Sequence, residues 1–164
     1  MNYRTNKVVS SAPAKVILFG EHFVVYSNPA IVAAINKRIS VQAQVNDKSR
    51  INIKSGENSL SVPVISKEEL STANDNSLLF LHPIFKCVKH VLSEKDLLSV
   101  GIDLDIDSQI PYGEGLGSSA ASCVSTVAAL YSLFSNRDRN QIYETARIME
   151  QNIHTNSSGI DCYV

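Results

Sequence analysis

The stretch Pro111-Tyr112-Gly113-Glu114-Gly115-Leu116-Gly117-Ser118-Ser119-Ala120-Ala121 sets three glycines at alternate positions and then opens a run of small residues. Glycine adopts backbone angles, and permits close approaches, that a Cβ atom would forbid. A helix that begins near Ser118 would present free N–H groups and the positive end of its dipole to this loop. Loop and helix together predict a cradle for a phosphate chain, in which a serine hydroxyl contacts a phosphate or its Mg²⁺.

Two common phosphate-binding loops do not match this stretch. No lysine follows the last glycine, as a Walker A loop requires, and the G-x-G-x-G spacing differs from the dinucleotide fingerprint. A tight turn with Ser118 as the N-cap of the next helix would use the same residue types. The loop alone therefore leaves the phosphate site and the plain turn as alternatives.

Length and composition indicate one folded domain. The 164 residues, 44% hydrophobic and 19% charged, are enough to form a core, and the net charge of −1 gives no basic surface for nucleic acid or an anionic membrane. The sequence has no apolar run of transmembrane length and no signal-peptide core. Cys87, Cys123 and Cys162 are odd in number and lack C-x-x-C spacing. We therefore expect neither a disulfide framework nor a zinc site, and a reducing cytoplasm as the compartment.

Hydrophobic periodicity predicts a mixture of strands and helices. Alternating apolar residues predict strands over 8–19, 39–45, 51–53 and 101–107, with a short apolar segment at 31–35. The polar turn at 46–50 favours a hairpin between the strands that flank it. Helical spacing predicts helices over 78–92, 118–134 and 138–153. The stretch 56–76 has little pattern and is expected to be a surface loop.

The strand predicted over 101–107 carries Asp103, Asp105 and Asp107 on one face. Three carboxylates so close together resemble a metal cluster at first sight. At a period of two, however, they are more typical of the solvated face of a half-buried strand.

Five side chains outside the loop are candidates for chemistry. Lys15 stands at the start of an apolar run, where a bystander lysine would be poorly solvated. Glu21 and His22 follow the glycine that ends this run, although a structural role for His22 is the plainer alternative. Glu150, on the last predicted helix, and Asp161, after a small polar loop, would both face one cleft. Taken singly, these two would be interpreted as a surface glutamate and a turn-capping aspartate.

Three motifs in this order resemble the GHMP kinases. They are the segment 15–22 with its continuation to residue 30, the loop 111–121, and Glu150 with the segment 154–161. The resemblance covers nearly the whole chain, and within the family it is greatest to the mevalonate kinases. It implies an α+β fold, a ribosomal-protein S5 domain 2-like mixed sheet with helices packed on it. It also implies that residues 1–164 form the N-terminal, ATP-binding domain.

The resemblance assigns a role to each motif. It implies that ATP is bound by Pro111, Gly113, Gly115, Leu116, Gly117, Ser118, Ser119 and Ala120. Ser119 and Glu150 would hold Mg²⁺. Asp161 is the acid that attracts or accepts the proton of the attacking hydroxyl, and Lys15 is its cationic partner. Glu21 and His22 are implied contacts of the substrate.

Three local departures from the family pattern accompany these roles. Ala14 stands where the first motif usually has glycine, and Glu114 stands in the loop where a small residue is common. Thr155 and Ser157 replace glycine and proline before Asp161. None of these changes removes a charged group of the implied site.

The implied activity is transfer of a phosphoryl group from ATP to the primary hydroxyl of mevalonate, giving 5-phosphomevalonate for isoprenoid precursor synthesis. The C-terminal domain of the family is expected to be missing from this chain, which alone would be a weak or inactive catalyst. Mevalonate and ATP are the expected partners, and no nucleic-acid or membrane partner is expected. The sequence leaves open whether the protein forms a homodimer. A GHMP kinase for phosphomevalonate, a sugar or another small alcohol is one alternative. An inactive nucleotide-binding module is the other.

Overall fold

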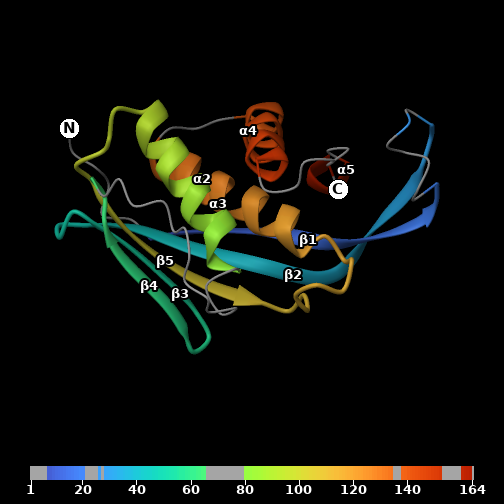
Figure 1. The fold of residues 1–164 in the computed structure, drawn as a ribbon, viewed down its shortest axis with the longest axis horizontal. Coiled ribbons are helices and arrows are strands. Elements are labelled where there is room, and N and C mark those ends of the chain that lie inside the picture. Colours follow the sequence, from blue (N-terminus) through green and yellow to red (C-terminus); the bar gives the residue numbers. More distant parts are fainter. Residues whose placement is uncertain are drawn as a thin grey trace.

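The computed structural model describes residues 7–20, 26, 28–65, 80–134, 138–152 and 160–163. Within these residues the protein is a five-stranded mixed sheet with helices on one face (Figure 1). The elements in chain order are β1 (Val8–Phe19), β2 (Ile31–Asn46), β3 (Arg50–Ser55), β4 (Asn58–Pro63), α2 (Leu81–Glu94), β5 (Gly101–Ser108), α3 (Ser118–Phe134), α4 (Arg139–Gln151) and α5 (Ile160–Tyr163). The predicted α+β class, with helices packed on a mixed sheet, is confirmed.

β1 and β2 form a long antiparallel pair at one edge of the sheet. β1 has the predicted bounds, with a register shift between Pro13 and Ala14. Proline cannot donate a ladder hydrogen bond, so an irregularity at this position is expected. The two predicted segments 31–35 and 39–45 form one strand, β2, because β2 pairs with β1 on both sides of this shift.

The hairpin predicted between β2 and β3 is wrong. The strand order is β1-β2-β5-β3-β4, so β5 lies between them, antiparallel to β2 and parallel to β3. The alternating apolar residues of β5 match both neighbours, with Ile106 opposite Val41 and Ile102 opposite Ile51. A parallel pair needs a long crossover connection, which the segment containing α2 supplies.

β4 is a strand that the sequence prediction missed. Asn58–Pro63 pairs antiparallel with β3 after a turn at Gly56, within the stretch expected to be a loop. As an edge strand it is largely exposed, and its short Leu60–Val62 alternation gives a weak pattern. Residues 66–76 of the predicted loop lie outside the described residues.

α3 is the central helix of the domain and has the predicted bounds. It packs on β1 and β2, with α2 and α4 on its flanks (Figure 1). α2 begins and ends later than predicted, at Leu81–Glu94. α4 begins after Asp138, whose side chain caps the helix by accepting a hydrogen bond from Gln141 N at 2.9 Å. Among the described residues, no helix is long and apolar enough to cross a membrane.

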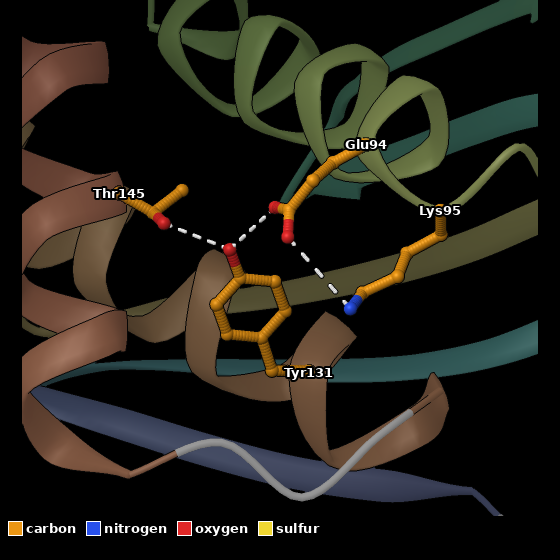
Figure 2. Close-up of polar contacts among 4 residues, drawn as sticks. All are labelled: Glu94, Lys95, Tyr131 and Thr145. Carbon is orange, nitrogen blue, oxygen red and sulfur yellow. Dashed lines mark hydrogen bonds and ion pairs between the residues drawn. The ribbon is translucent and has the colours of Figure 1, made fainter.

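A polar cluster ties α2, α3 and α4 together at the end of α3 (Figure 2). The hydroxyl of Tyr131, a residue only 2% exposed, lies 2.7 Å from Glu94 Oε2 and 2.7 Å from Thr145 Oγ1. A carboxylate only accepts, so Tyr131 donates to Glu94 and accepts from Thr145. Lys95 adds its ammonium group 3.7 Å from Glu94 Oε1. The cluster therefore fixes α3, whose other end begins at the glycine loop.

Of the three aspartates on the acidic face of β5, one is held by hydrogen bonds from side-chain amides. Asp103 accepts hydrogen bonds from the side chains of Gln44, Asn46 and Asn52. Asp105 and Asp107 are exposed. Within the described part of the chain, no group of three or more histidine, cysteine, aspartate or glutamate residues could hold a metal ion.

Candidate functional site

The loop between β5 and α3 turns on three glycines. Gly113, Gly115 and Gly117 have φ angles of 84°, 72° and 74°, which lie in the left-handed region that disfavours residues with a Cβ atom. The alternation of these angles folds the backbone into a compact loop at the start of α3. Glu114, the unusual carboxylate of this loop, is exposed.

Gly117 also meets β1. A Cβ atom at this position would lie 2.9 Å from Lys15 Cγ, so the loop crosses directly over the lysine side chain. The backbone N–H of Lys15 donates to Leu116 O at 3.0 Å, which fixes the loop to the strand. The sequence did not indicate this backbone contact. Ala14, which replaces the family's glycine beside Lys15, is fully buried.

The first turn of α3 carries two hydroxyl groups without a hydrogen-bond partner among the residues that the structure describes. Ser118 Oγ and Ser119 Oγ are both buried, and neither makes a hydrogen bond within the described residues. The alternative in which Ser118 caps the helix is wrong, because Ser118 is itself helical and the N–H of Ala121 donates to Gly117 O at 2.9 Å. Buried polar atoms are normally satisfied. The two hydroxyls are therefore available to hydrogen-bond a ligand at this helix end.

Lys15 and Asp161 form an ion pair beside the loop. Lys15 Nζ lies 3.0 Å from Asp161 Oδ1, and the side chains are 8% and 28% exposed respectively. The pair joins β1 to the single turn α5, two elements from opposite ends of the chain. A partly buried pair of this kind holds its two groups in one geometry and is screened less than a surface pair.

Glu150 lies at the end of α4 and is 4% exposed. It accepts a hydrogen bond from Cys162 Sγ at 3.2 Å, so consecutive residues of α5 contact Lys15 and Glu150. Burial, followed by the negative charge of Glu150, raises the pKa of Cys162 far above its usual range. The pKa of the Cys123 thiol is also raised, chiefly by its hydrogen bond with Cys87 and by burial, with a smaller contribution from Glu150. The thiol of Cys162 thus contacts the buried carboxylate directly.

A groove of about 620 Å³ opens next to this region, between β1, α3, α4 and α5. Asp161 and Cys162 line it, but the glycine loop, Lys15 and Glu150 do not. We therefore place the candidate site by the loop and the ion pair, where charges and unsatisfied polar atoms converge, rather than by the volume of the groove.

Two of the predicted site residues have no structural account. Glu21 and His22 lie outside the described residues, as does the segment 153–159 before α5. The structure brings Lys15, the glycine loop, Ser119 and Asp161 to one end of the helical layer, with Glu150 connected through Cys162. The contact of Cys162 with Glu150 was missed by sequence reasoning, since nothing in the sequence shows which residue a buried cysteine contacts.

Comparisons with known proteins identify the family of the chain. Residues 82–164 match the sequence profile of the family described as the GHMP kinases N terminal domain. The chain is 40% identical over 162 residues to the mevalonate kinase of Pyrococcus furiosus, covering 94% of this chain and 48% of that protein. It is 35% identical over 159 residues to the mevalonate kinase of Archaeoglobus fulgidus, covering 96% and 49%. The chain thus spans about half the length of the curated relatives it matches.

The fold is similar to that of a solved relative. The crystal structure of the Methanococcus jannaschii mevalonate kinase superposes with a TM-score of 0.82, over 98% of this chain and 52% of that chain. The two sequences are 24% identical in this comparison, so the likeness concerns the fold.

Proposed function

Because the chain belongs to the GHMP kinase family, we propose that it is the ATP-binding, N-terminal part of a kinase that phosphorylates the primary hydroxyl of mevalonate. The observation that carries the kinase chemistry is the Lys15–Asp161 pair lying beside a left-handed glycine loop. The choice of mevalonate is supported by the relatives of 35–40% identity, which are named mevalonate kinases. We propose ATP and a small alcohol as partners of this site.

The residues present fit a phosphate chain with Mg²⁺. The backbone of the glycine loop and the N-terminus of α3 suit an anion, and the buried hydroxyls of Ser118 and Ser119 lack partners within the described residues. Ser119 and Glu150 would hold Mg²⁺, which prefers oxygen ligands. When bound, Mg²⁺ neutralises charge on the phosphate oxygens.

Asp161 and Lys15 would act on the acceptor hydroxyl. Phosphoryl transfer depends on positioning and charge stabilisation more than on covalent chemistry by the protein. The carboxylate of Asp161 would orient the hydroxyl and accept its proton as the new O–P bond forms and the bond from the γ-phosphorus to the bridging oxygen breaks, with ADP as the leaving group. Lys15 would hold this carboxylate in place and stabilise the negative charge that develops on the attacking oxygen. The two groups lie 3.0 Å apart, so both can act on the same hydroxyl.

Release of ADP by the full-length protein tests the proposal. The assay would contain ATP and Mg²⁺ with mevalonate, phosphomevalonate, homoserine or galactose as the acceptor. Turnover with mevalonate alone, abolished in Asp161→Asn while ATP still binds, is the expected result. Turnover with another acceptor would support the proposed phosphoryl transfer but contradict mevalonate as the substrate. Bound ATP without turnover on any acceptor would instead favour a nucleotide-binding module, and near-normal turnover of Asp161→Asn would contradict the role of Asp161.

A further inference from the structure

The thiol of Cys162 makes a defined contact with a buried carboxylate. Its sulfur lies 3.2 Å from Glu150 Oε2, and the two residues are 6% and 4% exposed. An ionised carboxylate has no proton to give, so the S–H group is the donor. The contact therefore fixes one oxygen of Glu150 from the side of α5.

Cys162 directly follows Asp161, so its contact with Glu150 is linked to the ion pair between Asp161 and Lys15. Asp161, the preceding residue, is paired with Lys15 at 3.0 Å. The single turn α5 is thus attached to β1 through one residue and to the end of α4 through the next. A movement of α5 that displaced Asp161 would also displace the donor that holds Glu150.

We propose that Cys162 is a positioning residue, which holds the Glu150 carboxylate in the orientation needed to bind a divalent cation. The inference rests on the function proposed above, in which Glu150 is the metal carboxylate. It concerns a side chain that would touch neither the metal nor the substrate.

The Cys162 hydrogen bond restrains a glutamate at a helix end, in addition to the packing that leaves Glu150 only 4% exposed. Its side chain has three rotatable bonds, and Glu150 lies in the last turn of α4, directly before the helix ends at Gln151. Hydrogen bonds from neighbouring groups orient metal-binding carboxylates, and their loss commonly weakens metal binding about 10–100-fold. Because a thiol is a weak donor, we expect an effect at the lower end of this range.

The test compares three single variants of the full-length protein: Cys162→Ala, Cys162→Ser and Cys87→Ala. Cys162→Ala removes the donor, and Cys162→Ser keeps a donor of smaller size. Cys87→Ala is the matched control, since it removes a fully buried thiol on α2 that hydrogen-bonds to Cys123. Mn²⁺ affinity in the presence of ATP is measured by electron paramagnetic resonance, with the KM for Mg²⁺, kcat and the melting temperature alongside.

We expect Cys162→Ala to weaken Mn²⁺ binding and raise the KM for Mg²⁺ by about tenfold, with a smaller change in kcat. Cys162→Ser should recover part of this loss, and Cys87→Ala should bind Mn²⁺ as the wild type does. Unchanged Mn²⁺ affinity in Cys162→Ala would overturn the inference and leave the proposed function intact. An equal loss in Cys87→Ala would overturn it as well, because the effect would then be a general loosening of the core. Failure of the wild type to bind Mn²⁺ with ATP, or to turn over, would instead contradict the proposed function.

Discussion

The ammonium group of Lys15 lies 3.0 Å from a carboxylate oxygen of Asp161, and the aliphatic part of the same lysine supports the glycine loop at Gly117. One side chain thus contacts both the loop proposed to bind phosphates and the acid proposed to act on the acceptor. Lys15 is 6% exposed, so its charge is poorly hydrated and depends on its protein partners.

Replacing Lys15 by methionine should therefore reduce turnover while the loop keeps its support. The substitution retains a long apolar side chain below Gly117 but removes the charge beside Asp161. We expect kcat to fall by about a hundredfold or more, as when one preorganised electrostatic group is removed from an active site. Steady-state kinetics of the full-length protein measure this. Lys54→Met, on the exposed surface of β3, is the control, and an equal fall in both variants would argue against a specific role for Lys15.

The hydroxyl of Ser119 should matter for the nucleotide rather than for folding. Its buried oxygen has no partner within the described residues, so Ser119→Ala removes no protein hydrogen bond. We expect an unchanged melting temperature and a KM for Mg-ATP raised about tenfold, the effect of losing one hydrogen bond to a charged group. Ser132→Ala is matched to it, because that hydroxyl lies on the exposed side of the same helix and donates to Ala128 O. A lower melting temperature with unchanged KM in Ser119→Ala would show that the hydroxyl is structural.

Gly117→Ala should damage both the loop and Lys15. The φ angle of 74° costs a non-glycine residue about 1–2 kcal/mol, and the new Cβ atom would lie 2.9 Å from Lys15 Cγ. Gly56→Ala separates the two effects, since Gly56 has a φ angle of 57° and open space around it. We expect both variants to lower the free energy of unfolding, measured in urea, but only Gly117→Ala to lose turnover as well. Equal turnover in the two would mean that the loop adapts without moving Lys15.

The elements predicted best are those with a strong local pattern. The bounds of β1 and α3 follow from apolar runs with clear ends, and Asp138 is a cap residue recognisable by type. The β2–β3 hairpin failed because pairing partners are chosen by the whole sheet. The turn at 46–50 is compatible with a hairpin, yet β5 offers a matching apolar face to both strands.

The candidate site shows the same limit. Residue types and spacing suggested the glycine loop, and its left-handed angles are present. The association of Lys15 with Asp161 followed only from the family resemblance, because spacing does not show that β1 and α5 meet. The Cys162–Glu150 contact had no sequence signal at all, and the roles of Glu21 and His22 remain predictions.

Tyr131→Phe should destabilise the helical layer without changing the site. The substitution keeps the buried ring but removes the hydroxyl that joins Glu94 to Thr145 (Figure 2). We expect the free energy of unfolding to fall by about 1–2 kcal/mol, because buried polar partners lose a hydrogen bond. Urea denaturation measures this, with Tyr112→Phe as a control on an exposed ring. A loss of the same size in the control would show that the cluster contributes nothing particular.

Asp103 should make stability depend on pH in the acid range. Burial raises the pKa of this carboxyl, but hydrogen bonds from Asn52, Gln44 and Asn46 outweigh it, so its net pKa lies below the usual 3.8. A pKa lower in the folded than in the unfolded state means that ionised Asp103 stabilises the fold above the unfolded pKa. This stabilisation is lost as the pH falls through the folded pKa.

Asp103→Asn tests this dependence, because asparagine cannot ionise. At pH 7 the variant should be less stable than the wild type, and the difference should shrink as the pH falls from about 4 through the folded-state pKa of Asp103. Urea denaturation across this range measures the change, and Asp105→Asn, on the exposed face of the same strand, is the control. If the wild-type and Asp103→Asn stability curves run parallel from pH 7 to pH 3, the amide contacts do not select the ionised carboxylate.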